Sequence, residues 1–328
     1  MTTRLSRFFT CAAVLLSAAF LPGGAAAQQA YPQRPIRIVI PWPPGQATDL
    51  AARVIGQKLN EMFGYTMVMD NRPGAGGQIG TDIAAKSTPD GYTLLAASAG
   101  PVTVAPLLQK TPYNPPRELL PVAIAGISPY ILVTAPNFPA KDIKEFIALV
   151  KGNPGKYTYA SSGTGAAAHL VVEYFNGSTG IKATHVPYKG SIPALTDIVG
   201  GQVTYMTETV AATMPFIRQG RLRGFGISIA KTTPLAPGIP TIAAAADIPG
   251  FDFGAWIGIM VATGTPKHAI EKITSGVNKA LQTQDARDKI ANAGLEPQYF
   301  NAEAMGEYLK KQSGQVAEII KRANIKVE

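Results

Sequence analysis

Two long apolar stretches, each interrupted along its length, bracket the central part of this 328-residue chain. Residues 120–134 contain Gly126 and Pro129, and residues 251–261 contain Gly254. Proline cannot donate to the hydrogen-bond ladder of a sheet and glycine weakens a strand interior, so both stretches are predicted to be interrupted strands. A chain that enters and leaves an inner unit through such strands crosses twice between two lobes, which is the layout of a two-lobe hinge.

Strand and helix patterns alternate on both sides of these stretches, and this predicts α/β layers with largely parallel sheets. A β-branched run at 36–40 ends at Pro41, and residues 49–63 then carry apolar side chains at helical spacing up to Gly64, a typical C-cap. The other expected strands are 67–69, 93–97, 157–160, 183–186, 203–206 and 222–228. The other expected helices are 79–86, 141–151, 166–177, 192–199, 211–219, 266–283 and 302–323. The expected lobes are residues 28–126 plus 254–328, and residues 127–253.

The N-terminus has the pattern of a secretory signal peptide covering residues 1–27. Arg4 and Arg7 precede an apolar run too short for a membrane span, which needs about 20 residues, and Ala25–Ala27 provides the small residues of a cleavage site. The only cysteine, Cys11, lies inside this segment, so the exported chain has no disulfide, cysteine nucleophile or cysteine-ligated metal. We therefore expect a soluble periplasmic protein cleaved at that site.

Charge and composition narrow the class of ligand. The net charge of +9 favours an anionic ligand, but the basic residues are scattered, without the dense stripe that is typical of nucleic-acid binding. With 46% hydrophobic and 16% charged residues, the chain has the composition of a folded protein, and its length favours two domains over one core.

Two loops between a strand and a helix carry the strongest binding signals. Residues 41–49 (PWPPGQATD) precede the first helix, and residues 161–165 (SSGTG) precede a helix of the inner unit. Ligands of open α/β sheets bind at the carboxyl ends of strands, and the free N–H groups at a helix N-terminus suit a carboxylate. The simpler interpretation of the first loop is a Pro/Gly turn in which Thr48 or Asp49 caps the helix. Because its own charge would repel an anion, Asp49 is expected to fix the loop instead of touching the ligand.

Patterns for catalysis, nucleotides and metals are weak. The stretch 74–80 (GAGGQIG) follows a strand and opens a helix, but its spacing departs from the dinucleotide fingerprint, and a glycine-rich turn is the better interpretation. His169 and Glu173 are four residues apart on a helix, but without a third nearby ligand a packing and hydrogen-bonding pair is favoured over a metal site. Motifs with an identifiable nucleophile and base are missing, and we expect no cofactor, no metal and no enzymatic activity.

Six stretches, in one order along nearly the whole exported chain, resemble the substrate-binding proteins of tripartite tricarboxylate transporters, also called the Bug family. They are YPQRPIRIVIPWPPGQATDLAARVIGQKL, MDNRPGAGGQIGTDIAAKSTPDGYTLL, TPYNPPRELLPVA, YASSGTGAAAHL, THVPYKGSIPALTDIVGGQV and the GTP at 264–266. The resemblance implies a type II periplasmic-binding-protein fold with two lobes and two crossing strands. It also implies a monomer that binds a small carboxylate (a di- or tricarboxylate, an amino acid or an aromatic acid) and delivers it to transporter membrane subunits.

The resemblance also assigns candidate ligand contacts. Those of the two loops and of the third strand are Gly45, Gln46, Ala47, Thr48, Asp49, Ser162, Gly163, Thr164, Gly165 and Ser98. His169 is either a further contact or a core residue.

Two departures from the family pattern concern the ligand. Gln46 stands where the family commonly has a second glycine. Glu208 lies in the stretch 206–209, where the family often has an Asp-Asn pair, and it is a candidate contact for the far end of the ligand. Two other functions remain open: a sensory module that docks on a receptor ectodomain, and an α/β enzyme acting on a carboxylic acid.

Overall fold

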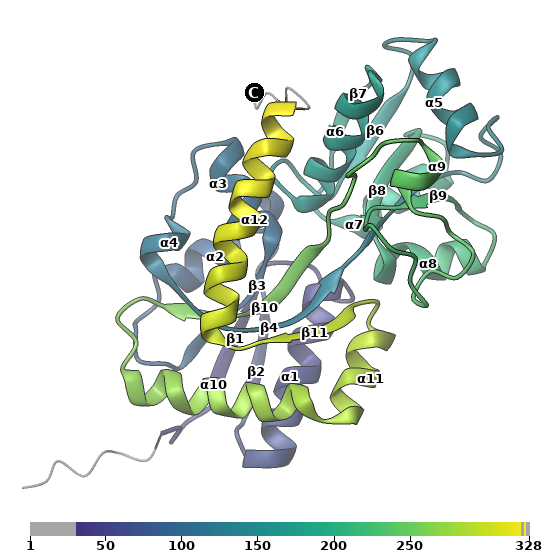
Figure 1. The fold of residues 1–328 in the computed structure, drawn as a ribbon. Coiled ribbons are helices and arrows are strands. Elements are labelled where there is room, and N and C mark those ends of the chain that lie inside the picture. Colours follow the sequence, from purple (N-terminus) through teal and green to yellow (C-terminus); the bar gives the residue numbers. More distant parts are fainter. Residues whose placement is uncertain (1–30, 323–324, 326–328) are drawn as a thin grey trace, which may run out of the picture. The chain divides into compact units, whose positions relative to one another are not determined.

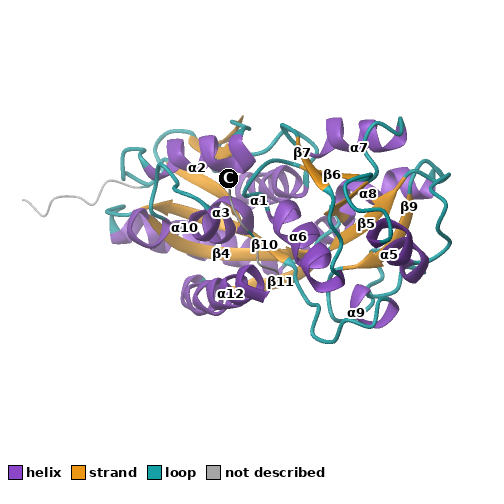
Figure 2. Cartoon of the chain, turned by 90° about the horizontal axis from the view of Figure 1, so that it is seen from above, coloured by secondary structure: helices purple, strands orange, loops and turns teal. Residues whose placement is uncertain are grey.

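The computed structural model describes residues 31–322 and residue 325, and it contains two β-sheets flanked by helices (Figure 1, Figure 2). Its helices and strands all lie in the unit that begins at Arg34. The expected signal peptide, residues 1–27, lies outside the described residues. None of the described helices is both long enough and apolar enough to cross a membrane.

The first sheet contains six strands. They are β1 (Ile36–Ile40), β2 (Met67–Asn71), β3 (Thr93–Ser98), β4 (Leu119–Ser128), β10 (Ala255–Ala262) and β11 (Glu296–Phe300). Their order is β11-β4-β10-β3-β1-β2. β1 is parallel to β2 and β3, whereas β10 is antiparallel to β3 and β4, and β11 is antiparallel to β4.

The second sheet contains five strands. They are β5 (Tyr130–Thr134), β6 (Thr158–Ser161), β7 (Thr184–Pro187), β8 (Tyr205–Thr209) and β9 (Arg223–Ile227). Their order is β7-β6-β8-β5-β9. β6 is parallel to β7 and β8, and β5 is antiparallel to β8 and β9. In the first sheet β2, β1 and β3 are adjacent and parallel, and the next strand, β10, runs the opposite way. In the second sheet β7, β6 and β8 are adjacent and parallel, and the next strand, β5, runs the opposite way.

These mixed sheets correct the expectation of largely parallel sheets. Strand–helix alternation accounts for the parallel trios, because a crossover helix returns the chain to the same edge in the same direction. The strand that opposes each trio, β5 in one sheet and β10 in the other, is the first to follow a passage from the other sheet. Such a strand enters its sheet without a crossover helix, so it is free to run antiparallel.

The chain passes between the sheets twice. β4 gives way to β5 at Pro129, as the sequence indicates. The returning strand, expected from Phe251, begins only at Ala255, because Phe251 and Phe253 bury their rings in the core before strand pairing starts. Ala255 pairs with Ser128, so the two passages lie side by side (Figure 1).

All eight expected helices are present. They are α1 (Ala47–Phe63), α2 (Gln78–Ala85), α5 (Ile143–Lys151), α6 (Ala167–Thr179), α7 (Ser191–Val199), α8 (Val210–Arg218), α10 (Lys267–Gln282) and α12 (Ala302–Arg322). Seven elements of the described chain were not predicted, and most of them are single turns that give too little periodicity. They are η1 (Ala75–Gly77), η2 (Gly100–Val104), α3 (Ala105–Leu108), α4 (Pro115–Glu118), α9 (Ile242–Ala245), α11 (Gln284–Asn292) and β11.

Alternation along β5 buries the second sheet on both faces. Tyr130 and Leu132 belong to the core that includes residues of α5 and α6, whereas Ile131 and Val133 belong to the core that includes residues of α7 and α8. Successive side chains of a strand point to opposite faces, so one strand joins both cores. The first core also contains Val316 of α12 and residues of the first sheet, and it therefore runs through both sheets.

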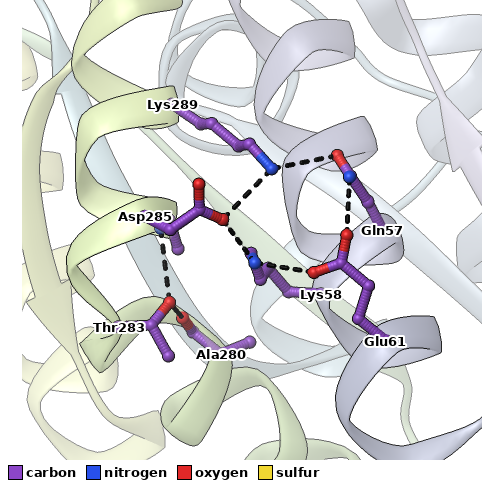
Figure 3. A network of polar contacts seen from close by, with 8 residues as sticks. Gln57, Lys58, Glu61, Ala280, Thr283, Asp285 and Lys289 are labelled. Atoms are coloured by element: carbon purple, nitrogen blue, oxygen red, sulfur yellow. Dashed lines mark hydrogen bonds and ion pairs between the residues drawn. The ribbon is translucent and has the colours of Figure 1, made fainter.

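Polar contacts tie α1 to the helices that follow β10 (Figure 3). Lys58 of α1 pairs with Glu61 at 2.6 Å and with Asp285 of α11. Lys289 of α11 contacts Asp285 at 3.1 Å and Gln57 of α1 at 3.5 Å. Exposed pairs contribute only about 0–1 kcal/mol each, so the network chiefly orients α1 against its neighbours.

Candidate ligand-binding site

One pocket lies where β3, β4 and β8 end and where α1 and α6 begin. It encloses about 370 Å³ between the lining atoms, part of which is open to solvent. Its lining contains no lysine, arginine or histidine. The lining residues are Trp42, Gln46, Ala47, Thr48, Ser98, Gly100, Ser128, Tyr130, Ser162, Ala167, Ala168, Glu208, Thr209, Ala255 and Ile257.

Half of the candidate residues line this pocket. Those that do are Gln46, Ala47, Thr48, Ser98, Ser162 and Glu208. Those that do not are Gly45, Asp49, Gly163, Thr164, Gly165 and His169. Sequence reasoning missed Ser128 and Tyr130, which flank the break at Pro129. The break at Pro129 could have identified these two residues, because residues where the chain passes from one sheet to the other lie in the space between the sheets.

The first loop leads from β1 into α1. The helix begins at Ala47 with Gln46 as its N-cap, so the alternative of a cap at Thr48 or Asp49 is wrong. The N–H groups of a first helical turn have no partner within the helix. Ala47 and Thr48 belong to that turn and line the pocket, so the loop presents backbone donors there.

Asp49 braces the first loop from outside the pocket lining. Its carboxylate accepts hydrogen bonds from Gly45 N, from Asn71 Nδ2 and from two nitrogens of Arg53, all at 2.9 Å. Burial by itself raises the pKa of Asp49, but the hydrogen bonds from Arg53, Asn71 and Gly45 outweigh it and hold the pKa below its ordinary value. Asp49 is therefore ionised at pH 7, and Arg53 offsets its charge.

The second loop leads from β6 into α6. α6 begins at Ala167, one residue after the expected start, so Thr164 lies in the loop as expected. Gly163 and Gly165 adopt φ values of 134° and 77°, which L side chains rarely tolerate. Among the expected contacts of this loop, Ser162 alone lines the pocket, and the first turn of α6 takes the place of the others.

Two histidines brace the second loop. Gly165 N donates to His169 Nδ1 at 3.4 Å, and the His169 ring stacks on His185 with centroids 4.3 Å apart. Ser161 Oγ bonds His185 Nε2 at 2.7 Å and accepts from Gly163 N at 3.2 Å. Burial, with a smaller contribution from His185, lowers the pKa of His169 to about 3, and burial lowers the pKa of His185 to about 4. Both rings are therefore neutral at pH 7, which lets His169 Nδ1 accept.

His169 and Glu173 do not form the hydrogen-bonding pair that their spacing suggested. Glu173 instead accepts a hydrogen bond from the hydroxyl of Tyr159, and burial raises the pKa of Glu173 above its ordinary value. Within the described part of the chain, no three His, Cys, Asp or Glu side chains are grouped so that they could hold a metal ion.

Glycines bring loops of the two sheets into backbone contact. The glycine-rich stretch 74–80 packs against the second loop, where a Cβ on Gly76 would lie 2.5 Å from Thr164 O. A Cβ on Gly100 would lie 3.1 Å from Ala167 N at the start of α6. Side chains at these positions would therefore hold the loops apart, and the stretch serves as a packing surface.

Four buried polar atoms at or beside the pocket have no hydrogen-bond partner among the described residues. They are Gln46 Nε2, Ser128 Oγ, Ser191 Oγ and Glu208 Oε2. Ser191 belongs to the set because its hydroxyl lies close enough to influence the Glu208 carboxyl. Buried polar atoms nearly always have partners, so several unpartnered ones in one place mark a binding site.

Comparison with known proteins agrees with this architecture. Residues 51–325 match the family model described as tripartite tricarboxylate transporter family receptor. BugT of Bordetella pertussis is 38% identical over 269 residues, which cover 81% of this chain and 82% of BugT. The chain belongs to the Bug family of tripartite tricarboxylate transporter receptors.

Solved structures of Bug-type proteins share the fold. The periplasmic binding protein BugD is 32% identical with a TM-score of 0.85, over 91% of this chain and 100% of BugD. An R. palustris protein solved with adipate is 29% identical with a TM-score of 0.86, over 90% of this chain and 99% of that protein. The expected family and the periplasmic-binding-protein fold are thus confirmed, and the chain is a solute-binding protein of this kind.

Replacing Asp49 by Asn should loosen the first loop of this Bug-family receptor. An amide cannot accept from Gly45, Arg53 and Asn71 together as the carboxylate does. The free energy of unfolding should fall by about 1–3 kcal/mol, less than for a fully buried pair because Arg53 is 46% exposed. Urea unfolding measures this loss, and hydrogen exchange should show faster exchange of the Gly45 amide.

The control for this experiment is Asp70→Asn. Asp70 also pairs with two arginines, Arg37 and Arg72, but it lies outside the pocket lining. Its replacement should leave exchange at Gly45 unchanged. If Gly45 exchanges equally slowly in the Asp49→Asn protein and the wild type, Asp49 does not brace the loop.

The His169 brace should make stability depend on pH. The pKa of His169 is about 3 when folded against an ordinary 6.5, so the unfolded chain binds more protons between these values and stability falls as pH falls through them. At pH 5, protonation of His169 in the unfolded chain lowers the free energy of unfolding by about 2 kcal/mol. His169→Asn should therefore shrink the stability difference between pH 7 and pH 5 by about 1–2 kcal/mol in urea unfolding. Glu173 has a raised pKa and acts in the opposite direction, but it is present in both proteins. An unchanged difference would show that His169 is protonated as readily in the folded chain as in the unfolded one.

Proposed function

We propose that this receptor captures a small carboxylate in the periplasm and delivers it to the membrane subunits of a tripartite tricarboxylate-type transporter. One observation carries the proposal: the N-termini of α1 and α6 and a group of unpartnered polar atoms meet in a pocket without basic side chains. A helix N-terminus offers backbone N–H groups and the positive end of the helix dipole. The adipate in the R. palustris structure shows that a related protein takes a carboxylate.

Neutral donors are sufficient for useful affinity. A hydrogen bond to a charged group contributes about 1.5–3 kcal/mol net. Three or four such bonds reach the roughly 8 kcal/mol of a micromolar site before the costs of ordering are subtracted. An arginine clamp is therefore unnecessary, and the receptor avoids the desolvation cost of a buried cation.

We infer that the lobes separate for ligand entry. The residues that line the pocket are buried and come from strands of both sheets, so a solute reaches them only when the two sheets move apart. We place the lobes at residues 28–126 plus 254–328 and at residues 127–253, with the hinge at the two adjacent passages near Pro129 and Ala255. Closure over the ligand would then exclude water and complete its set of donors.

Calorimetry with a panel of short mono-, di- and tricarboxylates and amino acids tests this function. We expect at least one member to bind with micromolar or tighter affinity. Native mass spectrometry of the protein purified from periplasm should show a copurified carboxylate. In a separate experiment, the membrane subunits of the transporter should copurify with the receptor. A chain that binds no member of the panel and carries no copurified solute would defeat the proposal.

Gly100→Ala should impair closure. The added methyl group would approach Ala167 N to 3.1 Å, and Gly100 does not have the positive φ at which any side chain would be strained. Overpacking of this kind costs about 1–3 kcal/mol, so affinity for a carboxylate found by calorimetry should fall about tenfold or more. Small-angle scattering should also show less ligand-induced compaction than in the wild type.

The matched control is Gly306→Ala in α12, where no atom lies within 4 Å of the new Cβ. That variant should bind and compact as the wild type does. If Gly100→Ala does the same, the contact between Gly100 and α6 is no part of the closing motion.

A further inference from the structure

Glu208 is a buried acid whose charge has no counterpart in the pocket. The side chain is only 3% exposed. Its Oε1 accepts a hydrogen bond from Thr209 N at 2.8 Å, while Oε2 is buried and has no partner among the described residues. No lysine, arginine or histidine lines the pocket. An ionised carboxylate in such a place costs far more than a few hydrogen bonds from neutral groups return.

The neighbours of Glu208 reduce this cost without removing it. Burial raises the pKa of Glu208 above its ordinary value, although the Thr209 N–H and the hydroxyls of Ser191 and Ser162 oppose the rise. Tyr130, the titratable group beside it in the pocket, brings no positive charge, and burial and Glu208 raise its pKa further. Glu208 therefore gains most from a ligand that supplies a cation or a strong hydrogen-bond donor.

Gln46 presents the opposite chemistry in the same pocket. Its Nε2, buried and without a partner among the described residues, can only donate. The first turns of α1 and α6 also contribute donors. These donors suit a carboxylate, whereas Glu208 suits an ammonium group. A molecule with both groups supplies each with a partner, and where these are its only charges it is neutral overall and brings no second negative charge close to Glu208.

We propose that Glu208 makes this receptor selective for amino acids, with its carboxylate receiving the ammonium group of the ligand while the starts of α1 and α6 hold the carboxylate. The proposal rests on the carboxylate-binding function proposed above. It gives Glu208 the role of a specificity-determining residue. It also distinguishes this receptor from its adipate-bound relative, because adipate has no ammonium group.

Calorimetry with matched pairs of ligands tests the proposal. After a thermal-shift screen of the twenty common amino acids, each amino acid that binds is compared with the carboxylate that lacks only its amino group, such as alanine with propanoate or valine with 3-methylbutanoate. We expect the amino acid to bind at least about tenfold more tightly than its partner at pH 7. Glu208→Gln should remove most of that preference by weakening the amino acid.

The control variant is Glu173→Gln, because Glu173 is a half-buried acid whose pKa is also raised by burial but which lies outside the pocket lining. It should keep the preference, and thermal melting should show that both variants are folded. Tighter binding of the deaminated partners would overturn the proposal, as would an unchanged preference in Glu208→Gln. If the affinity for a dicarboxylate falls as the pH rises, Glu208 acts as a protonated hydrogen-bond donor. That result would also overturn the proposal. These outcomes contradict only the amino-acid selectivity and leave the proposed carboxylate-binding function in place. If no ligand of the screen or of the carboxylate panel binds, both proposals are wrong.

Discussion

The structure near the site depends on one constraint. The backbone N–H groups at the starts of two separate helices, α1 and α6, must keep fixed positions around one pocket. A helix N-terminus positions its donors only as well as the loop before it is fixed. Asp49 and His169 each accept an N–H from their own loop, at Gly45 and Gly165. The first brace is a charge offset by Arg53, and the second is a ring kept neutral by burial. Neither places an uncompensated charge beside a bound anion.

Much of the fold could be predicted because it depends on local patterns. The run at 36–40, the helix that ends at Gly64 and the break at Pro129 each follow from residues close together in sequence. The direction of two strands could not be predicted in this way. β5 and β10 run antiparallel to their neighbours β8 and β3, and each is the first strand after the chain passes from the other sheet. Pairing between distant segments leaves no local pattern, so sequence periodicity could not reveal it.

The site was predictable to the extent that it lies at strand–helix junctions. Gln46 and Ser162 line the pocket as expected, but Thr164 does not, and the glycines on either side of it, Gly163 and Gly165, both have positive φ. A motif gives the order of residues and leaves the path of the loop undetermined. Tyr130 was missed for another reason: it reaches the pocket from a passage between the sheets, and its neighbours there are distant in sequence.

The bare glycine contacts between loops have an evolutionary consequence. Where Gly76 meets Thr164 O and Gly100 meets Ala167 N, main-chain atoms do the fitting, and the identity of surrounding side chains matters little. Residues of the pocket lining, such as Glu208, are then free to change without disturbing how the loops meet. BugD keeps the fold at a TM-score of 0.85 with only 32% identity. Receptors with this architecture can therefore diverge in the residues that line the pocket while inheriting the same contacts between the loops.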